Sequence, residues 1–208
     1  MLPMIDLLVF LPACFVLNLA FGPNNLLALT HGAQHGVAFA VSASAARLAV
    51  FVPMIAASAL GLGVLLSASA FLFGAIKIVG AVYLIWMGIK LLRTRPARAG
   101  VGTEYLKPSF RQAFRREALI AVSNPKAILI FAAFFPQFVD TTAYWQSYAS
   151  LGAIFIALET CAITVYALAG RFAAAFASTR LHWFQRISGG GMIAFGVLLL
   201  FSRQPGRA

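Results

Sequence analysis

The chain has 208 residues, of which 62% are hydrophobic and only 10% charged, and its mean hydropathy is +0.90. A soluble domain carries about 25% charged residues, so this composition excludes a water-soluble globule and makes the lipid bilayer a partner. The formal net charge is +11, but most basic residues lie between apolar runs, where they orient membrane proteins. Nucleic acid is therefore not an expected partner.

Apolar runs follow one another along the chain, and most are about 20 residues long, the length of helix that spans a hydrocarbon core of about 30 Å. Helices are expected because backbone groups that face lipid must bond within their own segment. The runs also lack the alternation of a membrane β-barrel. We therefore predict an all-α membrane protein with six transmembrane helices, at residues 5–30, 37–66, 70–92, 117–139, 147–170 and 183–202.

The connection over residues 93–116 is the longest and is rich in Pro, Gly, Lys and Arg. It predicts a flexible basic linker between an N-terminal three-helix half, 1–92, and a C-terminal half, 117–208, which together form one transmembrane domain. Eight Lys and Arg residues lie between Lys90 and Arg116, and basic loops stay in the cytoplasm. We expect a multi-pass protein of a bacterial inner membrane, with this loop in the cytoplasm and both termini outside it.

Proline-containing motifs interrupt the first and fourth runs. They read Gly22-Pro23-Asn24-Asn25 and Asn124-Pro125-Lys126. Proline breaks or kinks a helix, and open backbone at membrane depth is tolerated only where it is buried in protein or lines a cavity. Because each half has three helices, the second copy must be inverted, and matched broken helices in inverted repeats point to a transporter's substrate site. We expect that site at these motifs; a kink that only aids packing is the alternative.

Charged residues inside the apolar runs are the next candidates. Arg47 costs about 2.5–3.5 kcal/mol at mid-membrane, so it should face the protein interior and have a partner. Glu159 is the carboxylate expected deep inside a run, and we predict that the two meet. They form either a structural ion pair or a site where Arg47 binds a substrate carboxylate and Glu159 binds its ammonium or carries a coupling proton. Lys126 either extends to the interface or contacts the substrate.

Other polar residues on the segments of Arg47 and Glu159 are expected to complete a polar pocket. They are Ser42, Ser44, Thr160, Thr164 and Tyr166. His31 and His35 stand four residues apart, a spacing that could bind metal, but no Cys or carboxylate is near them in the sequence, and we place them at the cytoplasmic rim. We expect no metal, no cofactor and no catalytic residue.

Several motifs together make the chain resemble the LysE/RhtB-type amino-acid exporters. In chain order they are Gly22-Pro23-Asn24, Leu60-Gly61-Leu62-Gly63, Lys77-x-x-Gly80-Ala81-x-Tyr83-Leu84-x-Trp86-x-Gly88, Asn124-Pro125-Lys126 and Phe134-Phe135-Pro136-Gln137-Phe138-Val139. The resemblance covers nearly the whole chain and implies a six-helix, proton-driven exporter, not an enzyme, for homoserine, threonine, leucine, lysine or related compounds. The family usually has Pro where this chain has Phe21, which predicts a looser first break.

Two other functions compete with amino-acid export. A heavy-metal cation exporter would need several carboxylates, His or thiolates converging in the membrane, and only Glu159 and Cys161 are placed for that. A transmembrane thiol–disulfide electron carrier would need a paired Cys in each half, whereas Cys14 has no counterpart near Pro125. A second copy of the chain, forming a homodimer, is a further candidate partner.

Overall fold

Helices make up the whole of the described architecture. The computed structural model describes residues 4–68, 70–93 and 109–173, together with 186, 190–194, 196–197 and 200–201, and these ranges contain no strand. The α-helices are α1 (Met4–Leu19), α2 (Pro23–His35), α3 (Val37–Ala68), α4 (Ala70–Arg93), α5 (Phe110–Ser123), α6 (Pro125–Leu129) and α7 (Tyr144–Ala173). Between α6 and α7 lie a π-helix, η1 (Ile130–Phe134), and the 3₁₀-helices η2 (Phe135–Phe138) and η3 (Thr141–Ala143). The all-α class is confirmed.

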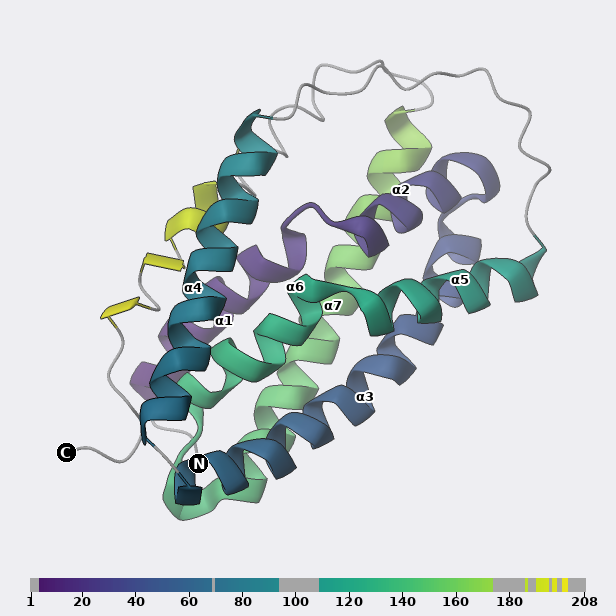
Figure 1. Cartoon of the computed structure of the whole chain (residues 1–208). Helices are drawn as coiled ribbons and strands as arrows, with labels where there is room; N and C mark the ends of the chain where they lie inside the picture. Colours follow the sequence, from purple (N-terminus) through teal and green to yellow (C-terminus); the bar gives the residue numbers. More distant parts are fainter. Residues whose placement is uncertain are drawn as a thin grey trace.

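Two stretches are long and apolar enough to cross a membrane unbroken: Val37–Gly61 in α3, and Thr141–Phe172, which contains most of α7. Two further spans result if each of two bent helix pairs counts as a single span. The bend between α1 and α2 is 63°, and the bend between α5 and the segment Pro125–Phe138 is 48°. The chain is therefore a multi-pass membrane protein. In Figure 1, α2 and α5 run across the bundle at a steep angle to α4 and α7.

The fourth span begins earlier than the sequence indicates. α5 starts at Phe110, so the boundary at residue 117 is wrong, and the last residues of the expected 93–116 linker are helical. Ser109 begins this helix with a capping box: its hydroxyl accepts the N–H of Gln112, whose side chain accepts the N–H of Ser109. The arginines that follow are exposed, which is why this amphipathic stretch reads as a polar connection.

The revised boundary also places the two helix breaks at matching depths. α1 has 16 residues before the first break, and α5 has 14 before the second. At 1.5 Å per residue, each break falls near the middle of its span. A start at residue 117 would instead put Pro125 close to one end of the fourth span.

α2 packs directly on α7 at two glycines. A Cβ at Gly32 would overlap the backbone of Ala167, and a Cβ at Gly170 would overlap the backbone of Leu29. Small residues at such positions let helix backbones approach closely. Gly36, with φ 87°, then turns the chain from α2 into α3 in a conformation that favours glycine.

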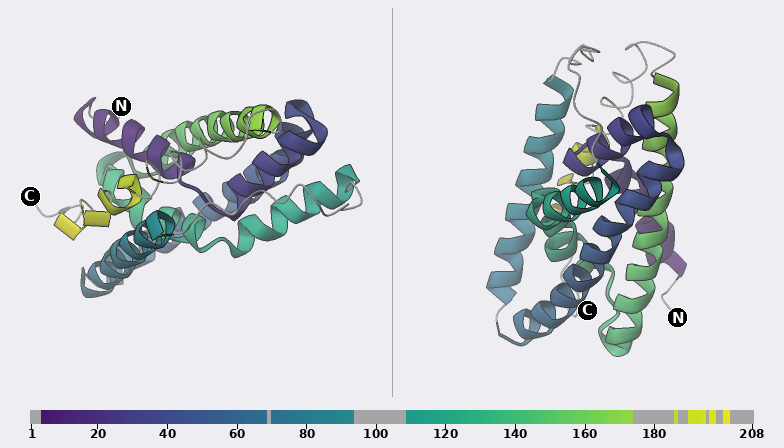
Figure 2. Two further views of the ribbon diagram at one scale, coloured as in Figure 1. Left: turned by 90° about the horizontal axis from the view of Figure 1, so that it is seen from above. Right: turned by 90° about the vertical axis from the view of Figure 1, so that its right-hand side faces the viewer.

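α4 lies at the edge of the bundle, on the side away from α7 (Figure 2). Gly196, from the sixth expected span, packs against it, because a Cβ there would lie 2.7 Å from Ile85 Cγ1 and 2.9 Å from the Ala81 oxygen. The described parts of that span are helical. The other residues of that span lie outside the described ranges, so the count of six spans stays a prediction.

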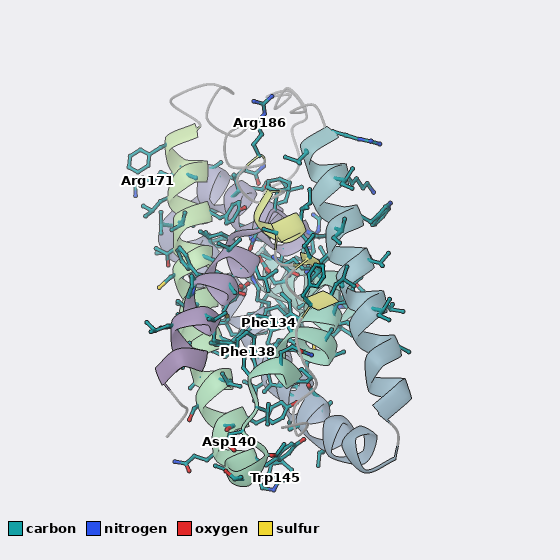
Figure 3. All side chains as sticks on the ribbon, turned by 90° about the vertical axis from the view of Figure 1, so that its left-hand side faces the viewer. Phe134, Phe138, Asp140, Trp145, Arg171 and Arg186 are labelled. Carbon is teal, nitrogen blue, oxygen red and sulfur yellow. The ribbon has the colours of Figure 1, made fainter. Side chains whose placement is uncertain are left out.

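The two ends of the bundle differ in charge. Figure 3 shows Arg171 and Arg186 at one end, and Asp140 and Trp145 at the opposite end. Phe134 and Phe138 lie between them, on the Asp140 side. We name the end with Arg171 and Arg186 the arginine end, and the end with Asp140 and Trp145 the Asp140 end.

Candidate substrate site

The first break separates α1 from α2 at residues 20–22. Pro23 begins α2, where its missing N–H is not needed and its fixed φ suits the first turn. The carbonyls that end α1 have no further helical partners, and at membrane depth they need others. The side-chain amide of Asn25 donates to two of them, the Asn18 oxygen at 2.8 Å and the Ala20 oxygen at 3.0 Å.

Residues from distant helices complete this closure. Lys126 of α6 donates from Nζ to the Ala20 oxygen at 2.8 Å, and Tyr166 of α7 donates from its hydroxyl to the Leu19 oxygen at 2.6 Å. Lys126 is buried, so it does not extend to a membrane interface, and that expected alternative is wrong. The first break is thus held by α6 and α7 as well as by Asn25.

The second break is the single residue Asn124, between α5 and α6. Its side-chain oxygen accepts the backbone N–H of Lys126 at 3.1 Å and so caps α6. Its side-chain amide donates to Asn24 Oδ1 at 3.0 Å. The two proline-containing motifs, one from each half of the chain, therefore lie in direct contact.

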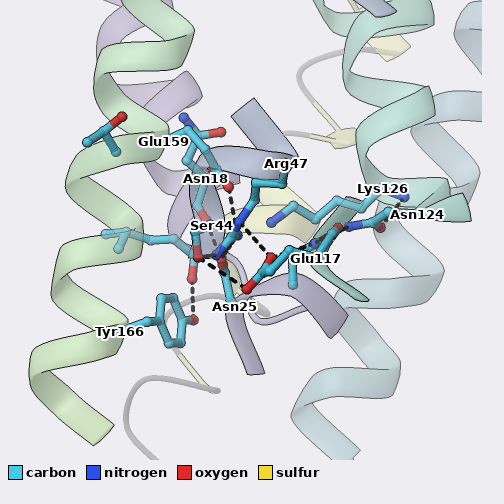
Figure 4. A network of polar contacts seen from close by, with 12 residues as sticks. Asn18, Asn25, Ser44, Arg47, Glu117, Asn124, Lys126, Glu159 and Tyr166 are labelled. Atoms are coloured by element: carbon cyan, nitrogen blue, oxygen red, sulfur yellow. Dashed lines mark hydrogen bonds and ion pairs between the residues drawn. The ribbon is translucent and has the colours of Figure 1, made fainter. Parts of the chain in front are cut away.

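Arg47 of α3 lies at the centre of the polar network that Figure 4 shows. Its side chain is fully buried, and its Nη1 donates to Glu159 Oε1 at 2.9 Å and to Asn25 Oδ1 at 3.0 Å. Its Nη2 donates to Ser44 Oγ at 3.3 Å. The contact predicted between Arg47 and Glu159 is present. Arg47 also binds the first break through Asn25, which the sequence did not predict.

Glu117 is the residue that sequence reasoning missed. Its carboxylate is fully buried, and Oε2 lies 3.2 Å from Arg47 Nε. Asn24 Nδ2 donates to Oε2 at 3.1 Å and Ser44 Oγ donates to Oε1 at 3.1 Å. Because two arginines precede Glu117 and it is the first residue of the expected fourth span, it reads as a polar residue at the edge of that span. The available signal was helical spacing: Ala113, Glu117 and Ala121 recur every four residues and form the buried face of α5.

Most of the expected site residues surround one cavity of ≈ 10 Å³, which is about the room that a single water molecule needs. Of the nine candidates, all but the two prolines line it: Gly22, Asn24, Asn25, Arg47, Asn124, Lys126 and Glu159. Pro23 and Pro125 begin the helices that bring these residues together. The remainder of the wall is Asn18 and the apolar residues Phe51, Ala127, Ile130 and Phe155.

The expected polar pocket is only partly present. Ser44 and Tyr166 belong to the network, whereas Thr160 and Thr164 donate to carbonyls of their own helix. Ser42 is exposed, so its expected place in the pocket is wrong. His31 is buried and lies with Nδ1 3.9 Å from Glu117 Oε1, away from the rim where the sequence placed it.

The described residues also bear on the competing functions. No three His, Cys, Asp or Glu side chains in that part of the chain gather as a metal site would require. Cys14 is buried and Cys161 is exposed, and both are free thiols.

A cluster of aromatic rings extends from the cavity towards the Asp140 end. Neighbouring rings have centroids 4.9 to 6.3 Å apart. We name it the phenylalanine cluster: Phe10, Phe51, Phe131, Phe134, Phe135, Phe138 and Phe155. Its π-helical segment, η1, departs from regular α-helix beside the cavity, as π-bulges at functional sites often do.

Comparison with known proteins gives a consistent result. The sequence profile described as LysE type translocator matches residues 15–203. An uncharacterized membrane protein of Pseudomonas aeruginosa is 35% identical, over 89% of each chain. A leucine efflux protein of Klebsiella pneumoniae is 27% identical, over 85% of this chain and 84% of its own. A leucine efflux protein of Enterobacter sp. is 35% identical, over 64% of each chain. No solved structure matches the chain.

Proposed function

The chain belongs to the LysE type translocator family, and we propose that it exports a neutral aliphatic amino acid from the cytoplasm, driven by protons. Transport of amino acids out of the cell is the activity in the names of its leucine efflux relatives. The observation that carries the proposal is the cavity at the two helix breaks, which is lined by the Lys126 ammonium, the Arg47 guanidinium, the Glu159 carboxylate, four asparagines and an apolar wall.

The cavity offers a partner for each end of a zwitterion. The ammonium of Lys126 and the first turn of α2 suit a substrate carboxylate, because a helix N-terminus carries partial positive charge. Gly22 is at the N-cap of α2 and has no side chain to cap the helix. Glu159 suits the substrate ammonium. Of its two expected roles, the cavity position favours this one over carrying the proton.

Arg47 has a different role in this proposal. Its guanidinium already contacts Glu159, Glu117 and Asn25, so it organises the site and does not bind the substrate carboxylate directly. Buried ion pairs hold a fixed geometry when their hydrogen bonds are satisfied. Arg47 positions Glu159 for the substrate.

The apolar wall selects the side chain. Phe51, Ile130 and Phe155 provide no polar partner for a second charge, so lysine or glutamate would lose hydration there without compensation. An aliphatic side chain has no charged group whose hydration would be lost. Leucine is therefore the first substrate to test, and the cavity of ≈ 10 Å³ must open before leucine enters.

The proposed orientation follows the charge of the two ends. The arginine end and the basic 93–116 connection face the cytoplasm, and both termini lie outside it, in the bacterial inner membrane. The phenylalanine cluster then closes the cavity towards the outside. The two bent pairs support six spans arranged as two inverted three-helix repeats. Assembly of two copies into a homodimer stays a prediction.

Feeding dipeptides to a bacterial strain that overproduces the chain tests this proposal. Leucine, threonine and lysine dipeptides release their amino acids inside the cell, and the amounts outside are then compared with those of the empty strain. We expect leucine to accumulate outside most strongly, and Glu159→Gln and Lys126→Met to abolish the effect while both variants still reach the membrane. Equal export of lysine would contradict the apolar selection, and export of none would contradict the function.

A further inference from the structure

We propose that Glu117 is the residue that binds the coupled proton, and that it exchanges protons with the cytoplasm through His31. This inference rests on the proposed function, since it names the coupling group of the same site. Glu117 lies outside the cavity wall, whereas Glu159 is part of it. The two carboxylates are therefore separated by position, with Arg47 between them.

Arg47 contacts the two carboxylates through different edges of its guanidinium. Nη1 donates to Glu159 Oε1 at 2.9 Å, and Nε lies 3.2 Å from Glu117 Oε2. Every close polar neighbour of the Glu117 carboxylate in the described residues is a donor, namely Asn24 Nδ2, Ser44 Oγ and Arg47 Nε. A proton on Glu117 removes the negative charge that holds Arg47, and Arg47 is the one of these donors with another carboxylate to bind.

This geometry makes the proton and the substrate compete. When Glu117 is ionised, it shares Arg47, and Glu159 keeps negative charge for a substrate ammonium. When Glu117 is protonated, Arg47 pairs fully with Glu159 and opposes the ammonium. Proton binding and substrate binding therefore exclude one another, which is the requirement for exchanging one against the other. One proton entering for one zwitterion leaving moves one positive charge inward in each cycle.

Histidines lead from Glu117 towards the arginine end. His31 Nδ1 is buried without a hydrogen-bond partner in the described part of the chain and lies 3.9 Å from Glu117 Oε1. His35 is four residues further along α2, is half-buried, and stacks on Phe39, whose ring the His31 ring also contacts. An imidazole can act as a proton shuttle, because one ring nitrogen can accept a proton while the other releases one. The pair provides a route for a proton between Glu117 and the end of α2.

In the described part of the chain, few charged or titratable groups lie near Glu117. The titratable or charged groups that face it are His31 from α2, Arg47 from α3 and, beyond Arg47, Glu159 from α7. Arg116 lies on α5 itself and is exposed. Of these groups, only Glu117 lies beside both His31 and Arg47, and Arg47 is the arginine that also binds Glu159.

The experiment uses the full-length chain in proteoliposomes with radioactive leucine. Counterflow at equal pH on both sides measures leucine exchange, and an imposed pH gradient measures proton-driven movement. In Glu117→Gln we expect gradient-driven leucine movement to fall about tenfold or more. Counterflow should persist, but the leucine concentration at half-saturation should be higher and should no longer depend on pH. Glu159→Gln should lose both activities, and Ser123→Ala, an exposed control on α5, should lose neither.

The outcomes separate the two proposals. If the wild-type chain shows no counterflow with any amino acid tested, the proposed function fails. If it shows counterflow and Glu117→Gln keeps its response to the pH gradient, the assignment of the proton to Glu117 is overturned. If Glu117→Gln does not reach the membrane, Glu117→Asp is read instead. It should keep gradient-driven movement but shift the pH at which leucine half-saturation changes, and an unchanged pH would also overturn the assignment.

Discussion

The two helix breaks look alike in sequence, since each sets an asparagine beside a proline, but their backbone groups find partners in different ways. The second break closes itself, because the Asn124 side chain caps α6 two residues later. The first break depends on other helices, because its free carbonyls accept from Lys126 of α6 and Tyr166 of α7 as well as from Asn25. The first break is therefore coupled to the rest of the bundle, whereas the second is capped within its own segment.

This difference suggests where the protein opens. A break whose partners lie on neighbouring helices changes when those helices move, whereas a locally capped break moves as one body. Opening of the ≈ 10 Å³ cavity should therefore separate the first break from Lys126 and Tyr166. The second break should keep its cap. Four comparisons of variants test or sharpen this contrast.

Arg47→Ala should have the largest effect, because it removes the contact that joins the first break to Glu117 on the helix before the second. Two buried carboxylates would lose their cation, which costs about 3–5 kcal/mol. We expect export to be abolished and the unfolding midpoint in detergent to fall sharply, with insertion intact. Arg47→Lys is the control, and it should recover part of the stability. Normal export by Arg47→Ala would show that the arginine is only scaffold.

Gly32→Ala should come next, and it should affect only the first break. The added methyl would overlap the Ala167 backbone, so α2 must move off α7, at a cost of about 1–3 kcal/mol. Gly61→Ala is the matched control, since a Cβ there meets nothing within 4 Å. Thermal unfolding of both variants in the same detergent measures the difference. Equal unfolding temperatures for the two variants would mean that moving α2 off α7 costs no stability.

Asn25→Ala compared with Asn124→Ala measures the contrast directly. Asn25→Ala leaves the Asn18 oxygen without its partner, which costs about 1–3 kcal/mol, and takes one of two partners from the Ala20 oxygen and from Arg47 Nη1. Asn124→Ala removes a helix cap, at about 1 kcal/mol, and one contact with Asn24. We expect the first variant to unfold earlier. The reverse order would show that Asn124 contributes more to stability than Asn25.

Gly22→Ala should have the smallest effect. Its φ of −160° is open to any residue, and an added Cβ would make ordinary contact with Lys126 Cδ at 3.8 Å. The substitution should raise stability by about 0.4–1 kcal/mol by restricting the unfolded chain. Export should fall modestly, because the first break loses freedom to bend. Export at the wild-type rate would indicate that the break does not flex during transport.

Some features of the site could be read from the sequence, because they follow from the immediate environment of a residue. An arginine in the middle of an apolar run must have a buried partner, and Glu159 was the candidate with the same depth. Proline beside asparagine in two apolar runs predicted two breaks. These inferences needed only the length of a span and the chemistry of lipid.

The role of Glu117 could not be read in that way. Its neighbours Arg115 and Arg116 are exposed, and a local average assigns all three residues to a polar connection. The helix separates them, because residues four apart share one face, and the buried face of α5 consists of Ala113, Glu117 and Ala121. The decisive partners are far away in the chain: Asn24 and Ser44 are 93 and 73 residues from Glu117, and Arg47 lies on α3 with Ser44.

The sequence by itself therefore determined a helical membrane protein with two proline breaks and a buried arginine paired with Glu159. The tertiary structure decided that Lys126 turns inward, that Arg47 is shared with a second carboxylate, and that the first break is closed by distant helices while the second closes itself. The physical reason is that membrane insertion is governed by local hydrophobicity. The partner of a buried charge is governed by how helices cross, and that depends on side chains far apart in the chain.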